Sequence, residues 1–589
     1  MAFVDRQTLF PQGMTLGYFF RFQNRAMECV AAGALVSTGI IAMPGLAAPL
    51  NPEIKVGIEQ RFGQQPKDRL VLQAQPGDRL TLKFWTSGKP VTAVVEKLQV
   101  DIAQEPLSAP REDERLVIST HRSYESAETS AKQWRAKGYE VEIAQPENWQ
   151  VWAKRDRYDS TVSRLLLQED LKSKGLTTSY IDRKTLTARP TLSWEINGYR
   201  YNRRELEITA AQNVIQVGNQ SFGGRLRFQP NAYGSYTLVN QVPVETYLRG
   251  VVPHEIGSQA PETAVQAQTI LARTYALRNL RRFKVDGYEL CATTQCQVYE
   301  GLSGATPVSD RAIATTTGQV LTYGNELIDA LYSSTTGGVT AAFEDVWEGT
   351  PRPYLKAKID AYPNRIWDLN TRNLSEEKTF RAFIGLQKGF NEDGWDYLRW
   401  KVAAPLKQVN QNLREFLKKQ QHPLTAFSTI QNLQVVERSR SGRVQRLRVT
   451  TDLGAIDLAK DEILRAFEAP NSLLFYVEPV ADAKNPKVLG GFTFVGGGLG
   501  HAVGLSQAGS YALSKQGWSA AKILSFYYPN TSLQPLSSTM AFWKDTALSP
   551  SPSIQQAKTE GEEGFQIFGW KFPKLGLGSI LEWFQSLTA

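Results

Sequence analysis

The sequence lacks the motifs through which proteins usually bind nucleic acid. It contains no zinc finger, helix-turn-helix or aromatic-basic pattern, and only 3 cysteines and 4 histidines among 589 residues. The net charge is +9, but the basic residues are dispersed along the chain. Nucleic acid is therefore not the expected partner, and an anionic lipid or cell-wall polymer would fit the same charge. The length predicts two or three domains, and the composition, 42% hydrophobic and 21% charged, is that of a globular protein.

Long hydrophobic runs are also absent after the N-terminus. Arg21 and Arg25 precede an apolar run of about 15 residues that ends in small residues, a layout typical of a secretory signal. The run is shorter than the ~20 residues of a membrane-spanning helix. We therefore predict that residues 1–48 are a signal peptide cleaved near Ala47 or Ala48, with an uncleaved N-terminal membrane anchor as the alternative. The protein is expected to be exported to the periplasm or cell wall.

Two cysteines remain for the mature chain, because Cys29 lies within the predicted signal. An exported protein can oxidise Cys291 and Cys296 to a disulfide, whereas a cytosolic protein more often binds a metal with such a pair. Two thiolates are fewer than the four ligands that structural zinc requires. A disulfide and a zinc site both stay open at this point, and no other cofactor is expected.

The chain before residue 190 divides into two parts. Residues 51–110 alternate as strands do and are expected to form a β-rich segment. Residues 112–185 contain two successive strand-helix-strand units, and each helix ends at a glycine, Gly138 or Gly175, suited to a left-handed position. Two such units predict a small α/β sandwich. In pattern this stretch resembles the SPOR domain, which implies a peptidoglycan-binding module; a generic α/β spacer is the alternative.

Residues 190–540 are expected to form one larger domain, so the fold class is mixed α+β and multidomain. Strand patterns fill the beginning of this domain, and an inserted segment at about 365–485 combines amphipathic helix with a hairpin that turns at Ser441-Gly442. Residues 541–563 form a polar Ser/Pro/Glu linker, and residues 564–589 form an aromatic, amphipathic tail. The tail is expected to pack on the protein or a partner, with contact to a membrane interface as the alternative.

A single glutamate stands out in the stretch VVPHEIGSQAP, residues 251–261. Glu255 lies between an apolar run and a helix that is predicted to open at Pro261. Apolar neighbours such as Val252 and Ile256 would raise its pKa by desolvation, whereas the N-terminus of the following helix would oppose that rise. A solvated surface glutamate is the alternative, and the glutamate alone does not decide between them.

The stretch around this glutamate, VPVETYLRGVVPHEIGSQAPETAVQAQTILARTYAL, closely resembles the SpoIID/LytB family of bacterial cell-wall proteins. The other blocks of that family follow in the same order over about 300 residues: CATTQCQVYEG (291–301), TTGQVLTYGNELIDALYSSTTGG (316–338), EDVWEGTPRPYL (344–355), SRSGRV (439–444) and GHAVGLSQAGSYALSKQGWS (500–519). The resemblance implies a SpoIID-like catalytic domain with long strands and a central helix, preceded here by the SPOR-like sandwich.

The resemblance also implies an activity. Sporulation-type members are lytic transglycosylases, which cleave the β-1,4 bond between N-acetylmuramic acid and N-acetylglucosamine in strands without stem peptides and leave a 1,6-anhydro-muramic end. They use a glutamate at the position of Glu255. One carboxyl group suffices because the 6-hydroxyl of the sugar is the nucleophile, whereas hydrolytic glycosidases usually need two. The LytB branch implies the alternative function, a non-catalytic protein that binds peptidoglycan and stimulates an N-acetylmuramoyl-L-alanine amidase.

The same blocks imply a set of glycan-binding residues around the catalytic glutamate. They are Arg273, Tyr275, Ser333, Ser334, Thr335, Thr336, Gly337, Asp345, His501 and Gln507. Asp345 is expected to orient Arg273 or a substrate hydroxyl. His501 is expected to donate a hydrogen bond to glycan or to position Glu255. The alternatives are that Arg273 holds a buried carboxylate, that the Ser/Thr run is an ordinary turn, and that His501 is structural.

The sequence departs from the family pattern at two positions. Gln295 stands where a zinc-binding histidine is common in the CATTQCQVY block, which puts the zinc site at Cys291 and Cys296 in doubt. Gly257 stands where the family often has proline, which is expected to change only the local backbone. The expected partners are peptidoglycan glycan strands and a cell-wall amidase or a septal protein. Membrane contact is expected only through the N-terminus or the C-terminal tail.

Overall fold

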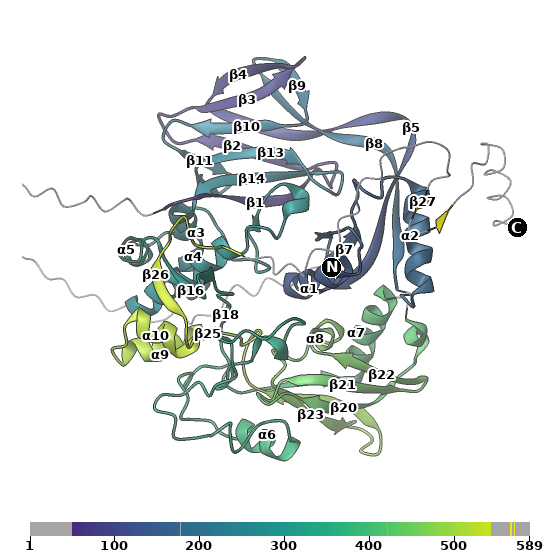
Figure 1. The fold of residues 1–589 in the computed structure, drawn as a ribbon, viewed down its shortest axis with the longest axis vertical. Helices are drawn as coiled ribbons and strands as arrows, with labels where there is room; N and C mark the ends of the chain where they lie inside the picture. The colour runs from purple at the N-terminus through teal and green to yellow at the C-terminus, as the bar shows by residue number, and fades with distance from the viewer. Residues whose placement is uncertain (1–49, 177, 421, 544–565, 568–569, 572–589) are drawn as a thin grey trace, which may run out of the picture. The chain divides into compact units, whose positions relative to one another are not determined.

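The computed structural model describes residues 50–543 apart from 177 and 421, together with 566–567 and 570–571 (Figure 1). The chain divides into two units, Met1–Ala48 and Pro49–Ala589. The predicted signal, and most of the predicted linker and tail, lie outside the described residues. In the described part of the tail, β27 (Gln566–Ile567) pairs with β28 (Trp570–Lys571).

A seven-stranded sheet joins the first strands of the second unit to strands much later in the chain. Its order is β15-β1-β14-β13-β10-β3-β4, and β1 is antiparallel to β14 with Ile54 opposite Val242. The strands are β1 (Glu53–Phe62), β3 (Leu80–Thr86), β4 (Lys89–Val95), β10 (Leu206–Ala210), β13 (Arg225–Pro230), β14 (Tyr236–Pro243) and β15 (Leu290–Cys291). The strands of residues 51–110 therefore share a sheet with the start of the predicted larger domain.

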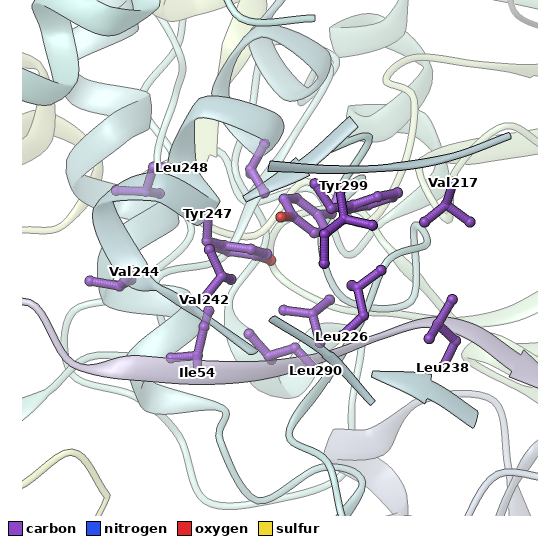
Figure 2. Close-up of a cluster of buried hydrophobic side chains, with 14 of the residues drawn as sticks. Ile54, Val217, Leu226, Leu238, Val242, Val244, Tyr247, Leu248, Leu290 and Tyr299 are labelled. Carbon is purple, nitrogen blue, oxygen red and sulfur yellow. The ribbon is translucent and has the colours of Figure 1, made fainter. Parts of the chain in front are cut away.

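This sheet holds α3 (Val244–Ile256), the helix that follows β14 directly. Alternation in β1 buries Ile54 on the core side while Lys55 stays exposed. Figure 2 shows Ile54, Val242 and Tyr247 of α3 gathered in one core. The ring of Tyr247 lies 4.8 Å from that of Tyr299, centroid to centroid. Packing against the sheet thus fixes the helix that ends beside Glu255.

A second sheet contains the two longest strands, β5 (Lys97–His121) and β8 (Tyr180–Ile196). They pair antiparallel from Val100 opposite Trp194 to Val117 opposite Tyr180. The order is β12-β11-β2-β5-β7-β6, with β8 on β5 and β9 on β8. The other strands are β2 (Arg69–Ala74), β6 (Val141–Ala144), β7 (Trp149–Ala153), β9 (Tyr199–Arg203), β11 (Val214–Val217) and β12 (Gln220–Gly223). The pair β5 and β8 carries the chain out to residues 121–180 and back (Figure 1).

The two predicted strand-helix-strand units are present in this outer part. Helix α1 (Tyr124–Ala136) lies between β5 and β6, and α2 (Thr161–Ser173) lies between β7 and β8. The strands follow the order β8-β5-β7-β6 and are all antiparallel, which is the split β-α-β arrangement. Gly138 and Gly175 follow the helices with φ of 90° and 87°, as predicted. The likeness to the SPOR domain stays a prediction.

The sheet of this α/β module is covered on one face by the module's own helices and on the other by the larger domain. Its two helices cover one face. On the other face Val117 and Trp152 pack against Ala232, in the loop before β14. Helix α1 also places Glu128 in a two-bond ion pair with Arg281 of the larger domain, at 2.6 and 2.9 Å. The module expected to bind peptidoglycan is thus joined to its neighbour by side-chain contacts as well as by the chain.

The expected central helix is α4 (Glu262–Arg278), in which 14 of 17 residues are buried. Alanines at 264, 267, 272 and 276 let neighbouring helices approach closely. It contacts α3, α5 (Pro307–Thr315), α9 (Gln507–Lys515) and α10 (Ala520–Tyr527). Two small sheets complete this part: β17-β16-β26, made of Glu326–Leu327, Gln319–Tyr323 and Ser532–Pro535, and the parallel pair β18 (Tyr332–Ser333) and β25 (Leu505–Ser506).

The inserted segment has a hydrophobic core of its own. Its sheets are β19-β24-β23 and β20-β21-β22. The elements are α6 (Glu377–Ile384), β19 (Trp400–Pro405), α7 (Leu406–Lys419), β20 (Ile430–Arg438), β21 (Val444–Thr451), β22 (Gly454–Ala459), α8 (Asp461–Ala466), β23 (Phe475–Ala481) and β24 (Leu489–Gly496), with a short 3-10 helix at Pro423–Ala426. Two further 3-10 helices, Lys284–Asp286 and Phe343–Asp345, lie earlier in the chain. The hairpin predicted at Ser441-Gly442 joins β20 to β21. In the described residues, no helix has the length and apolarity needed to cross a membrane.

Candidate active site

Glu255 stands at the carboxyl-terminal end of α3. The helix stops here because Gly257 has a φ of 84°, a left-handed value that favours glycine. A proline, common at this position in the family that the sequence resembles, is fixed near −65° and could not adopt that value. Helix α4 then begins at Glu262 with Pro261 as its N-cap, as predicted.

The Glu255 carboxyl group is partly buried and receives two hydrogen bonds. The backbone N–H of Val298 donates to Oε1 at 2.7 Å, and the Tyr332 hydroxyl bonds the same group. Both bonds favour the carboxylate, but desolvation beside buried residues such as Val252 and Ile256 outweighs them. The pKa of Glu255 therefore rises from 4.5 to about 7. A carboxyl group with that pKa can both give and take a proton near neutral pH.

The backbone of the same helical turn is held from α9. The side-chain amide of Gln507 donates to the carbonyl oxygen of Glu255 at 2.7 Å. The Tyr511 hydroxyl donates to the carbonyl oxygen of Ile256. The side chain of Gln507, which was predicted to bind glycan, thus contacts the backbone of Glu255, the candidate acid.

Tyr332 joins this site although the sequence analysis did not single it out. Its hydroxyl accepts a hydrogen bond from Nε2 of Gln297 at 3.0 Å, which leaves the hydroxyl proton for Glu255. The Tyr247 hydroxyl in turn donates to Oε1 of Gln297 at 3.2 Å. Gln297 and Tyr332 both lie inside the family blocks, but nothing in the residue types marked them as neighbours of a glutamate.

His501 is linked to the candidate acid, Glu255, through one intervening residue, Tyr332. Its Nδ1 accepts from the backbone N–H of Val503 at 3.0 Å, its ring packs on Trp347, and it hydrogen-bonds the backbone of Tyr332. Burial lowers the pKa of His501 to about 4, so the ring is neutral at physiological pH. The structure therefore connects His501 to Glu255 through Tyr332.

The hydroxyl loop at 333–338 lies beside the site, but half of its hydroxyls are used within the protein. Thr335 Oγ1 accepts from the backbone N–H of Leu499 at 2.8 Å, and Thr336 Oγ1 bonds two buried carboxyl groups. Ser333 Oγ is buried without a hydrogen-bond partner among the described residues. Ser334 is partly exposed, so of the four hydroxyls in the loop it is the one that remains accessible to a ligand.

Arg273 and Asp345 are placed in separate buried contacts. Arg273 is fully buried and pairs with Glu245 through Nε and Nη2, both at 2.7 Å, which corresponds to the alternative role given for it. Asp345 accepts from the Ser441 hydroxyl at 2.5 Å, so the expected contact between Asp345 and Arg273 is not formed. Tyr275 is buried near Glu255. Burial raises the pKa of its hydroxyl, and the charges of Glu125 and Glu255 add smaller increases.

Cys291 and Cys296 form a disulfide, which leaves neither thiolate for a metal. In the described ranges there is no group of three or more His, Cys, Asp or Glu side chains placed to hold a metal ion. The disulfide closes the loop of residues 291–296, two residues before Val298, the amide donor to Glu255. Of the two chemistries left open by the sequence, the structure has the disulfide.

We expect reduction of this disulfide to lower the free energy of unfolding by about 2 kcal/mol, the value for so short a loop. Denaturant unfolding with and without reductant measures the loss, and Cys291→Ser/Cys296→Ser should show the same loss and no response to reductant. A chelator should leave both proteins unchanged. Destabilisation of the wild type by the chelator would contradict the disulfide assignment.

The raised pKa of Glu255 has a consequence for stability. Since the folded pKa exceeds the unfolded one, the protonated group stabilises the fold fully below about pH 4.5, and this contribution is lost as the pH rises through about 7. Glu255→Gln removes the titration. Between about pH 5 and about pH 8 the variant should therefore gain about 2 kcal/mol of unfolding free energy relative to wild type, allowing for partial exposure. Denaturant melts at both pH values test this, and an equal difference at both would refute it.

Comparison with known proteins agrees with the family predicted from the motifs. Residues 232–323, which include Glu255 and Val298, match the family model described as stage II sporulation protein. Residues 341–504 match a model described as a domain of unknown function (DUF8618). The first matched region thus contains Glu255, and the second contains the inserted segment.

Three curated proteins show the same relationship along about half of this chain. The amidase enhancer of Bacillus subtilis (strain 168) is 30% identical over 304 residues, 49% of this chain and 40% of its own length. The stage II sporulation protein D of the same organism is 25% identical over 327 residues, 52% of this chain and 80% of its own. The stage II sporulation protein D of Bacillus amyloliquefaciens is 24% identical over 319 residues, which are 51% of this chain and 77% of its own length. The chain spans 40% of the length of the amidase enhancer. Its residues 232–323, which carry Glu255, thus form a SpoIID family region.

Proposed function

We propose that this protein is an exported peptidoglycan lytic transglycosylase that uses Glu255 as its acid and base. The observation that carries the proposal is the environment of Glu255, whose pKa burial raises to about 7. In the described part of the chain that pKa is set by burial, one amide and one hydroxyl, and by no second carboxylate. A lone carboxyl group suits a lytic mechanism better than a hydrolytic one, which usually needs two.

The reaction would proceed in two proton transfers at the same group. The protonated Glu255 gives its proton to the glycosidic oxygen of the MurNAc-GlcNAc bond, and the bond breaks. The resulting carboxylate takes the proton of the sugar 6-hydroxyl, whose oxygen bonds to the anomeric carbon and closes the 1,6-anhydro ring. The Val298 N–H and the Tyr332 hydroxyl stabilise the carboxylate between the two steps. No water enters, and Glu255 ends protonated as it began.

The remaining parts of the proposal concern the substrate and its location. Ser334 supplies a hydroxyl group beside the site for a sugar hydroxyl, and the net charge of +9 favours an anionic wall. Glycan strands without stem peptides are the proposed substrate, because sporulation-type members of the family cut such strands. Export through the N-terminal segment would bring the protein to them.

A second function is supported by one relative. A protein named amidase enhancer is 30% identical to this chain over the matched region. On that account the protein would bind peptidoglycan without cutting it and would stimulate a separate cell-wall amidase.

One experiment separates the two functions. Purified glycan strands with and without stem peptides are incubated with the protein, with an N-acetylmuramoyl-L-alanine amidase, or with both, and the products are identified by mass spectrometry. The proposed function predicts fragments one water lighter than hydrolysis products, made by the protein alone from strands without stems. Intact strands together with faster release of stem peptides by the amidase would replace it with the second function.

A further inference from the structure

A buried carboxylate outside the sequence motifs, Glu392, collects hydrogen bonds from two segments of the site. It lies in the inserted segment between α6 and β19 and is fully buried. Its Oε2 accepts from the backbone N–H groups of Gly337 and Gly338 at 2.9 and 3.1 Å. Its Oε1 accepts from the Thr336 hydroxyl at 2.8 Å, from the Thr336 N–H, and from the Ser506 hydroxyl at 2.5 Å. One side chain thus ties the loop after β18 to the residue that caps α9.

These two segments carry the groups that hold Glu255. The loop at 336–338 continues β18, whose Tyr332 bonds the Glu255 carboxyl group. Ser506 immediately precedes Gln507, whose amide bonds the Glu255 carbonyl oxygen at 2.7 Å. Strands β18 and β25 pair in parallel between these points, with Ser333 opposite Ser506. Glu392 therefore binds the two segments that carry the contacts of Tyr332 and Gln507 to Glu255, the candidate acid.

The loop around Glu392 requires glycine at two positions. Gly337 and Gly338 have φ of 71° and 83°, which favours glycine at both positions. A Cβ at Gly337 would lie 2.6 Å from the carbonyl carbon of Gly497, and one at Gly338 would lie 2.5 Å from the Phe390 ring. Both glycines thus pack closely against neighbouring atoms while their N–H groups donate to Glu392.

A second buried carboxyl group, Asp360, shares the Thr336 hydroxyl with Glu392. The hydroxyl oxygen lies 3.0 Å from Asp360 Oδ2 and 2.8 Å from Glu392 Oε1. A hydroxyl has one proton and cannot donate to both, so one carboxyl group must donate to it. Glu392 already accepts three backbone N–H groups, whereas Asp360 Oδ1 accepts only from Asn391 and Tyr527. The proton therefore resides on Asp360 Oδ2, in line with burial and the neighbouring Glu392, which both raise the pKa of Asp360.

We propose that Glu392 is a positioning residue for Glu255: its side chain fixes Tyr332 and Gln507 from the inserted segment, with Asp360 donating to the Thr336 hydroxyl. This inference rests on the proposed function only for the role of Glu255, not for the contacts themselves. Through Glu392, the proposal gives the segment at residues 341–504 a role in positioning the candidate acid.

The two carboxyl groups offer a matched pair of amide substitutions. In Glu392→Gln, the new NH2 group replaces either Oε1 or Oε2, and each of these oxygens accepts at least one backbone N–H. The hydrogen bonds to the replaced oxygen are therefore lost. In Asp360→Asn, the NH2 group replaces the proton that is donated to Thr336, and the amide oxygen still accepts from Asn391 and Tyr527. We therefore expect Glu392→Gln to loosen the site and Asp360→Asn to leave it unchanged.

Hydrogen exchange followed by mass spectrometry on the full chain tests this without any assay of activity. In Glu392→Gln, peptides covering 333–339 and also 291–299, where the Val298 amide bonds Glu255, should exchange roughly ten- to a hundredfold faster. In Asp360→Asn both should match wild type. The proposal is overturned if only 333–339 responds, or if both variants respond alike. Should Glu392→Gln fail to fold, Ser506→Ala removes one donor and must still raise exchange at 291–299.

An activity measurement separates this proposal from the proposed function. If wild type cuts glycan strands, Glu392→Gln should lower kcat at nearly unchanged KM and move the pH profile, because Glu255 loses the Tyr332 bond. A changed KM with an unchanged pH profile would overturn the positioning role. If wild type cuts no glycan, the proposed function fails, and the exchange result alone decides the role of Glu392.

Discussion

Glu255→Gln should abolish glycan cleavage while leaving the protein folded. Glutamine has nearly the same shape and can still accept the hydrogen bond from the Val298 amide. It cannot give a proton to the glycosidic oxygen. Since general acid catalysis contributes about 10²–10⁴ to a rate, the release of anhydro products should fall by at least about a hundredfold. The measurement is the initial rate of product release from strands without stem peptides.

Glu262→Gln serves as the matched control for this loss. Glu262 is an exposed glutamate in the first turn of α4, a few residues from the candidate acid. It should retain wild-type activity, and both variants should give the circular dichroism of the wild type. If Glu255→Gln cleaved within about tenfold of wild type, less than the smallest loss expected for a general acid, Glu255 would not be the acid.

Arg273→Met should cause a large loss of stability rather than a loss of glycan affinity. Arg273 is fully buried, binds both carboxylate oxygens of Glu245 at 2.7 Å, and donates to the carbonyl oxygen of Gln319 at 3.0 Å. Methionine would leave the Glu245 carboxylate without its partner in a largely dry site. Breaking such a pair costs about 3–5 kcal/mol, which denaturant unfolding should register.

The chain contains an exposed pair with the same geometry. Arg249 binds both oxygens of Asp310 at 2.8 and 3.0 Å, and both side chains are 41% exposed. Arg249→Met should therefore cost less than about 1 kcal/mol. Adding Glu245→Gln to Arg273→Met should recover part of the loss. A stable Arg273→Met protein that had lost glycan binding would instead support the ligand role expected from the sequence.

Local patterns predicted those parts of the fold that depend on neighbours in the chain. Glycines 138 and 175 end α1 and α2, and the turn at Ser441-Gly442 joins β20 to β21, because each signal acts over a few residues. The pairing of β1 with β14 has no such signal, since the two strands are far apart in sequence. Residues 51–110 therefore looked like a segment of their own until the pairing was known.

The same reasoning explains what was predicted of the site. Glu255 could be found because a block of family residues surrounds it. The direction of its pKa stayed open in the sequence, because the apolar neighbours and the N-terminus of the following helix have opposite effects. The Thr335 and Thr336 hydroxyls were expected to face a ligand, but their partners, Leu499 and Glu392, come from much later in the chain. Glu392 itself sits in a polar stretch, NEDGW, that is typical of an exposed turn. Only the three-dimensional structure shows that it is buried.

The central claim is that the fold holds Glu255 protonated near neutral pH. It is tested most directly by a ¹³C NMR titration of protein labelled at the glutamate side-chain carboxyl groups, with the spectrum of Glu255→Gln identifying the signal of Glu255. We predict a midpoint at about pH 7. A midpoint near 4.5, the ordinary value for a glutamate, would contradict the account, because Glu255 would then be ionised when it has to act as the acid.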